Sequence, residues 1–382
     1  MSHLLPMSMQ AGNWNGRKVR IDKGEKPFYN LNSNHYELQK INMRNYIICA
    51  EGVIHMKLRS KYRRLRHSLL TLCCFALVLA GCTQGSQSGI VEGKLNVVTS
   101  FYPIAFLTEQ IGGEHVNTIN LIPTGIEPHD WTPKSRDLHN ASNAQLLLVN
   151  GAGFETWLDD FLKGLDSSSN VKTLEVSKGI PLIEADGSEH EHHEGEGDAS
   201  EHAHEHEHGS TDPHTWVSPK SALTMASNVK DALVQADGAH KGEYEANYKQ
   251  LKSKIESVDK LYTEKLSSLK QREIVVSHHA FGYLCRDYGL TQHAIMGITP
   301  DAEPRAQDLV KLSKLVKEKG LKYVFFEELV SDQLANTLAG EAGVSTLVLN
   351  PLEGLTKQQA DQGDNYVTLM ERNLQNLLVA LQ

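Results

Sequence analysis

One long stretch without proline divides the chain. It covers residues 239–271 and contains a single glycine, near its start. Apolar side chains recur along it at helical spacing, namely Tyr244, Tyr248, Leu251, Ile255, Val258, Tyr262 and Leu266. About thirty helical residues would span ~45 Å. Because this stretch stands alone between two other regions, the pattern favours a rigid helix packed along both of them over a coiled-coil dimer.

Strand and helix patterns alternate on both sides of this stretch. Before it, expected strands lie near 95–99, 115–122, 144–151 and 171–176, with helices that begin near Pro103 and cover PKSRDLHNAS and FETWLDDFLKGL. After it, the same alternation runs from EIVVSHHAFGYLCRDYGL through VSTLVLN to a final helix near 364–381. Such alternation predicts βα units on parallel sheets. We therefore expect an α/β protein with an N-terminal lobe over 94–238, a linking helix over 239–271 and a C-terminal lobe over 272–382.

The segment that begins at Met56 has the features of a secretory signal. A basic region precedes a short apolar stretch, Leu69–Ala80, and LAGC follows with Cys82. The apolar stretch is too short to span a membrane. Since the LAGC ending resembles bacterial lipoprotein signals, we expect residues 56–81 to be removed, Cys82 to be lipidated and residues 82–93 to form a tether. Residues 1–55 would then be a non-native or disordered extension.

Removing this leader changes the charge of the protein. Residues 1–81 carry 13 of the 38 basic and 4 of the 47 acidic residues, so the remainder has a net charge of −18. A markedly acidic secreted protein is unsuited to nucleic acid, whereas it attracts cations. We expect a monomer that does not bind nucleic acid.

A histidine-rich tract, EHEHHEGEGDASEHAHEHEH, covers residues 189–208 within a predicted loop at 186–210. Its composition offers no apolar face, so it should be disordered without metal. We interpret it as an accessory metal-binding loop, through His190, His192, His193, His202, His204, His206 and His208. Ordering a loop costs about 1–2 kcal/mol per residue, so it should bind metal more weakly than a preorganised site. A solvated linker is the alternative.

Four further motifs concentrate metal-binding side chains. They are GIEPHDWTP with His129, DPHTWVSP with His214, VVSHHAFGYL with His278 and His279, and LVLNPLEGL with Glu353. Prolines stiffen two of these loops, and three of the motifs follow expected strands, where ligands bind in open α/β sheets. A single loop histidine is usually an ordinary surface residue. Three such histidines in one acidic secreted protein with a histidine-rich tract together favour a metal site. Three imidazoles and a carboxylate suit Zn²⁺, and imidazole favours zinc, copper or nickel over manganese.

The three histidine motifs, in this order, resemble those of the zinc-binding lipoproteins that serve bacterial ABC importers. The resemblance covers about residues 94–382, and a histidine-rich loop before the DPHxW motif matches the zinc-importing branch. It implies two α/β lobes with Zn²⁺ in the cleft between them, an ABC permease as partner, and His129, His214 and His278 as ligands. A carboxylate from the second lobe would complete the set.

The sequence alone does not decide which carboxylate is the fourth ligand. We place it at Glu353, with Glu327 and Glu328 as alternatives, while Glu127 or water completes the sphere in some relatives. Some relatives carry a residue other than histidine at the position of His279. We interpret His279 as a residue that supports the ligands or lines the pocket beside them.

Three other classes of protein could share some of these sequence features. A secreted zinc hydrolase would share the ligand types, but neither HExxH nor GxSxG occurs. The GAGF at 151–154 is a poor phosphate loop and fits a strand–helix turn. A manganese importer or a surface adhesin of the same family is the nearer alternative. We expect a binding protein and no enzyme, anchored at the extracytoplasmic face of the cell membrane.

Overall fold

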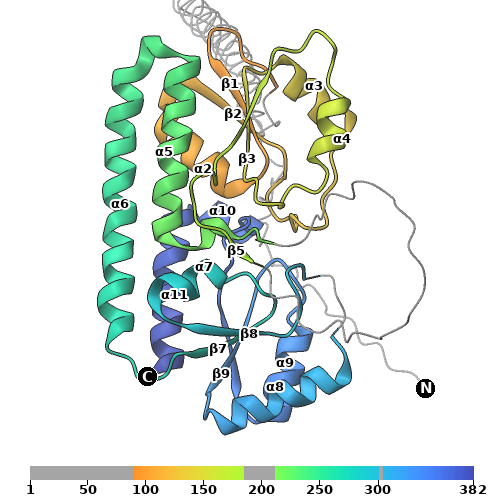
Figure 1. Ribbon diagram of the computed structural model, residues 1–382, viewed down its shortest axis with the longest axis vertical. Coiled ribbons are helices and arrows are strands. Elements are labelled where there is room, and N and C mark those ends of the chain that lie inside the picture. The colour runs from red at the N-terminus through yellow and green to blue at the C-terminus, as the bar shows by residue number, and fades with distance from the viewer. Residues whose placement is uncertain (1–88, 185–210, 301–303) are drawn as a thin grey trace, which may run out of the picture. The chain divides into compact units, whose positions relative to one another are not determined.

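The computed structural model describes residues 89–184, 211–300 and 304–382 (Figure 1). The expected signal sequence, Cys82, most of the tether and all seven histidines of the histidine-rich loop lie outside the described residues. None of the helices in the described part is long and apolar enough to cross a membrane.

A four-stranded parallel sheet forms the first lobe. Its strands are β1 (Leu95–Thr99), β2 (Val116–Asn120), β3 (Leu146–Val149) and β4 (Lys172–Glu175), in the order β2-β1-β3-β4. Every residue of β1 and β3 is buried, which explains their nearly continuous apolar sequences, LNVVT and LLLV. The connecting helices are α2 (Tyr102–Gly112), α3 (Ser135–Asn143) and α4 (Leu158–Lys163).

Helix α4 is shorter than its sequence pattern predicts, because its expected first turn has another role. The chain turns sharply at Gly151, Ala152 and Gly153, all with positive φ. The carboxylate of Glu155 accepts hydrogen bonds from the backbone amides of Asn150 and Gly151, at 2.7 and 3.0 Å. Glu155 therefore accepts from two amides of this turn, and the segment joins β3 to α4 as the predicted strand–helix turn.

The second lobe repeats this arrangement. Strand β7 (Glu273–Val276) pairs in parallel with β8 (Thr291–Ala294), and β9 (Tyr323–Phe326) pairs in parallel with β10 (Ser345–Val348). These pairs are two separate two-stranded sheets, but β7 lies beside β9, so the spatial order β8-β7-β9-β10 matches that of the first lobe. The helices are α7 (Gly282–Tyr288), α8 (Ala306–Glu318), α9 (Gln333–Ala342), α10 (Lys357–Gln362) and α11 (Tyr366–Leu381). Helix α10 was not predicted.

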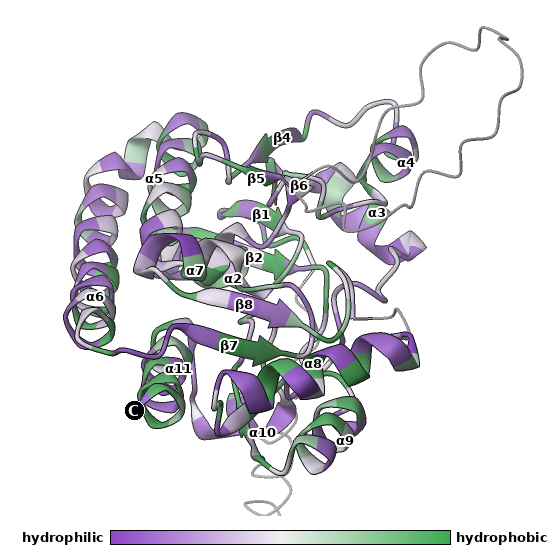
Figure 2. Ribbon diagram, turned by 60° about the horizontal axis from the view of Figure 1, so that its bottom comes forward, coloured by the Kyte–Doolittle hydropathy of each residue, from purple (hydrophilic) through white to green (hydrophobic). Residues whose placement is uncertain are grey.

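The long linking helix is confirmed as α6 (Lys241–Ser267), 27 residues that span ~40 Å. It packs against α2 and α5 (Pro219–Ala236) of the first lobe and against α7 and α11 of the second, and α5 and α6 run side by side in Figure 1. Six of its seven predicted apolar positions are buried, and Tyr248 is half-buried. The rest of α6 is mostly hydrophilic, whereas β7 is largely hydrophobic (Figure 2). Helix α5 was not among the elements that the sequence predicted.

Two residues on each side of the histidine-rich loop form a short antiparallel pair. Strand β5 (Ile183–Glu184) lies beside β6 (Thr211–Asp212). The hydroxyl of Tyr283 in α7 accepts from the amide of Ile183 and donates to the carbonyl of Asp212, at 3.3 and 2.7 Å. The chain on both sides of the loop is thus attached to the second lobe.

Candidate metal centre

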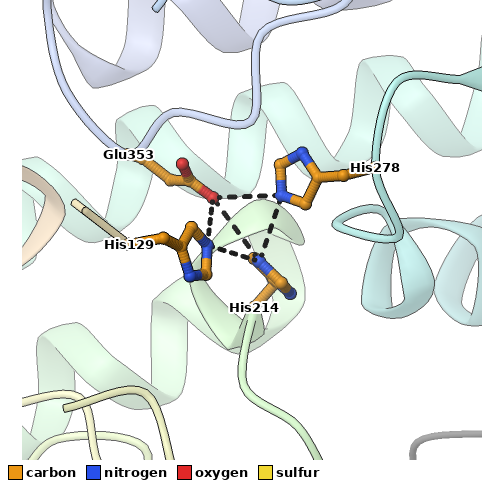
Figure 3. A group of neighbouring side chains, drawn as sticks. All are labelled: His129, His214, His278 and Glu353. Atoms are coloured by element: carbon orange, nitrogen blue, oxygen red, sulfur yellow. Dashed lines mark hydrogen bonds and ion pairs between the residues drawn. The ribbon is translucent and has the colours of Figure 1, made fainter. Parts of the chain in front are cut away.

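Four segments that are far apart in the sequence converge on one point (Figure 3). His129 lies in the loop between β2 and α3, and His214 directly precedes a 3-10 turn at Thr215–Val217. His278 follows β7, and Glu353 follows β10. The sequence motifs that we singled out therefore meet between the two lobes.

The distances between the donor atoms are those of ligands around one small ion. The Nε2 atoms of His129, His214 and His278 each lie 3.5 Å from Oε1 of Glu353. The Nε2 atom of His214 lies 3.4 Å from that of His129 and 3.3 Å from that of His278. Bonds of ~2.0–2.1 Å in a regular tetrahedron put neighbouring ligands ~3.3–3.4 Å apart. The four side chains can thus hold a tetrahedral cation with little movement.

The burial of Glu353 also fits a cation. His214, His278 and Glu353 are buried, and His129 is half-buried. Among the described residues, no group makes a regular hydrogen bond to either carboxylate oxygen of Glu353. A buried carboxylate without such partners is costly. A divalent ion at the centre of the four donors would offset that cost.

Two carboxylates behind the histidines orient the rings. Oδ1 of Asp212 lies 2.8 Å from Nδ1 of His214, and Oε1 of Glu327 lies 2.7 Å from Nδ1 of His278. A carboxylate on Nδ1 holds the proton there and leaves the lone pair of Nε2 directed at the metal position. Asp212 was not predicted, although an acidic residue two positions before His214 was a signal for it.

The other candidates for a fourth ligand have different partners. Glu327 faces the outer nitrogen of His278, and Glu328 accepts from Asn350 Nδ2 and Gln359 Nε2, at 2.8 and 2.6 Å. Glu127 accepts from the backbone amide of His129 at 3.2 Å. In the described part of the chain, Glu353 is therefore the carboxylate that the fold places among the three imidazoles.

His279 lies beside the cluster and does not belong to it. Its amide donates to the carbonyl of Gly297 at 2.8 Å, and its ring contacts the Gln292 side chain at 3.2 Å. With His293, Met296 and Leu312 it lines a cavity of about 350 Å³ on the second lobe. None of the four converging side chains lines this cavity, so the role of His279 beside the ligands stays a prediction.

The electrostatics of the cluster depend on burial and on the carboxylates. Burial lowers the pKa of His214 and outweighs the opposing effect of Asp212. Burial also opposes charge on His278, but Glu327 and Glu353 outweigh it and hold the pKa of this imidazole well above its usual value. Burial and the charge of Glu353 raise the pKa of Glu127 to about 9. Burial likewise disfavours charge on Glu353, but His129 and His278 keep its pKa well below the usual range, so that it remains an anion.

An unusual turn projects Glu353 into the cleft. Leu352 has a φ of 65°, which is uncommon for a residue with a side chain. The amide of Leu352 donates to Oδ1 of Asn350 at 2.7 Å, and Nε1 of Trp216 donates to the carbonyl of Pro351 at 2.8 Å. Trp216 belongs to the segment that carries His214. It therefore connects two of the converging segments directly.

Comparison with known proteins places the chain among zinc-uptake proteins. Residues 97–380 match the family described as zinc-uptake complex component A, periplasmic. The chain is 42% identical over 307 residues to the high-affinity zinc uptake system protein ZnuA of Bacillus subtilis, covering 80% of this chain and 93% of that protein. It is also 42% identical over 314 residues to the zinc-binding lipoprotein AdcA of Streptococcus pneumoniae, covering 81% of this chain but only 60% of AdcA.

A solved structure shares the fold. The crystal structure of the Zn(II)-bound ZnuA-like domain of Streptococcus pneumoniae AdcA superposes with a TM-score of 0.63 at 38% identity. The match covers 76% of this chain and 99% of that domain.

Proposed function

The chain belongs to the family of periplasmic component A proteins of zinc-uptake complexes, and we propose that it captures Zn²⁺ outside the cytoplasm and delivers it to an ABC permease. The observation that carries this proposal is the convergence of three imidazole Nε2 atoms on one buried carboxylate oxygen, at tetrahedral spacing. Under this proposal His129, His214, His278 and Glu353 are the zinc ligands.

The donor set suits capture and not catalysis. Catalytic zinc usually keeps one coordination position for water, whereas four protein ligands close the sphere. Three imidazoles also favour zinc over manganese, which prefers oxygen ligands. We infer a binding protein without hydrolytic activity.

Competition between the two metals on metal-free protein tests this function. We expect Zn²⁺ to displace Mn²⁺, and His278→Ala to lower zinc affinity by orders of magnitude because only water can replace the lost ligand. His279→Ala is the matched control, since its ring lies next along the chain but outside the cluster, and it should retain tight binding. Equal affinity for both metals, or unchanged zinc affinity in His278→Ala, would exclude the proposal.

We further propose that Cys82 anchors the protein to the outer face of the cell membrane through a lipid. The signal that ends in LAGC supports this location. Cys82→Ser should release the protein from the membrane fraction, and the mass of the wild-type N-terminal peptide should include the lipid. Retention of Cys82→Ser in the membrane would contradict the anchor.

A further inference from the structure

A second group of metal-binding side chains lies outside the cleft. Glu114 and His115 belong to a 3-10 turn at Gly113–His115, between α2 and β2, and Glu243 lies in the first turn of α6. One donor atom from each of the three residues lies within 4.8 Å of the other two. The group shares no residue with the cleft, and it joins segments that are 128 positions apart.

The imidazole of His115 is held in place within this group. Its Nε2 contacts a carboxylate oxygen of Glu243. Its ring stacks on that of His240, with centroids 3.8 Å apart and planes 15° from parallel. His240 is in turn fixed through Nδ1, which lies 2.6 Å from Oδ2 of Asp237. The orientation of His115 is therefore set by contacts on its face and at its edge.

The local charge favours a cation. The three carboxylates of Glu114, Asp237 and Glu243 outnumber the two imidazoles of His115 and His240. The group thus carries excess negative charge in a protein that is itself acidic. An imidazole with two carboxylates is a donor set that zinc accepts, and the imidazole favours zinc, copper or nickel over calcium and magnesium.

We propose that Glu114, His115 and Glu243 form a second binding site for a divalent cation of the zinc type, with His240 supporting the ring of His115. A bound ion would join the turn between α2 and β2 to the start of the linking helix. Because this proposal uses none of the cleft residues, it stands or falls independently of the proposed transport function.

Two features make this site weaker than the cleft. The side chain of Glu243 is 60% exposed, and immobilising it costs conformational entropy. The N-terminus of α6 carries a partial positive charge that opposes a cation. We therefore expect the site to fill only after the cleft.

Labelling of histidines with diethylpyrocarbonate, read by mass spectrometry for each residue, tests the proposal on the full chain. The protein is first loaded with one equivalent of Zn²⁺, and more zinc is then added. We expect the excess zinc to protect His115 from labelling, while His139, which is exposed on α3, stays reactive. Glu243→Gln should raise the zinc concentration for half-protection at least about tenfold, which corresponds to ~1.4 kcal/mol.

Glu245→Gln is the matched control, because Glu245 is exposed on the same helix and pairs with Lys241 outside the group. In this control variant, excess zinc should protect His115 at the same concentration as in the wild type. Both glutamine variants should bind Zn²⁺ in the cleft with unchanged affinity. The proposal is overturned if excess zinc leaves the labelling of His115 unchanged, if protection is already complete at one equivalent, or if the two glutamine variants behave alike.

Discussion

Individual side chains link the two halves of the metal centre, and Trp216 is the clearest case. Its indole N–H holds the carbonyl two residues before Glu353, while its own backbone lies two residues after His214. Its backbone carbonyl also accepts from the hydroxyl of Tyr366. We interpret Trp216 as a positioning residue that sets the distance between the two ligands.

Trp216→Phe removes the N–H donor and keeps an aromatic ring. A hydrogen bond contributes about 0.5–1.5 kcal/mol, so zinc affinity should fall roughly twofold to tenfold. Phe101→Leu is the control, because the ring centroids of Phe101 and Trp216 lie 4.6 Å apart. This variant should lower the stability of the fold without lowering zinc affinity. A competition titration with a zinc chelator measures both. If Trp216→Phe weakened zinc binding equally in a Glu353→Gln background, the positioning role would be wrong.

The protonation of His278 predicts how zinc binding depends on pH. Although burial opposes its charge, Glu327 and Glu353 raise its pKa, so the metal-free site keeps a proton to higher pH than an ordinary histidine does. Protons and zinc compete for the imidazole, so affinity should rise with pH through the raised pKa, with proton release on binding. Titration in a weak buffer with a pH indicator measures this release. Zinc affinity that stays constant from about pH 6 to 8, where unperturbed histidines titrate, would contradict it.

At the scale of elements, α6 holds the lobes through one buried face. Ile255 is 2% exposed in the middle of that face, whereas Leu261 on the same helix is 39% exposed. Ile255→Ala should lower the free energy of unfolding by about 2–5 kcal/mol, and Leu261→Ala should cost much less. Chemical denaturation measures the difference. Similar losses in the two variants would show that this face contributes little.

At the scale of the whole molecule, the histidine-rich loop lies between β5 and β6, which pair with each other. Asp212 of β6 contacts the ligand His214. Deleting residues 188–209 leaves residues 185–187 and 210 as a four-residue connection between β5 and β6, a common length for a hairpin loop. Asp212 should therefore keep its contact with His214. We expect the tight zinc site to survive while the weaker additional equivalents decrease, as measured by calorimetric titration. Loss of the tight site would make the loop the primary receptor.

Much of the architecture was predictable because local patterns encode it. Nearly continuous apolar stretches mark the buried strands, and the spacing from Tyr244 to Leu266 marks the face of α6. Helix α4 began late because Glu155 binds backbone amides from its expected first turn, and sequence patterns do not record such a contact.

The sequence alone identified the histidine motifs and the order of strands and helices, since both follow from neighbouring residues. It left four carboxylates open, because Glu127, Glu327, Glu328 and Glu353 all lie near strand ends. Only the packing of the lobes separates them: it puts Glu327 behind His278, gives Glu328 two amide partners, and leaves Glu353 among the imidazoles. Those distances depend on how segments more than 20 residues apart pack together, which no local pattern contains.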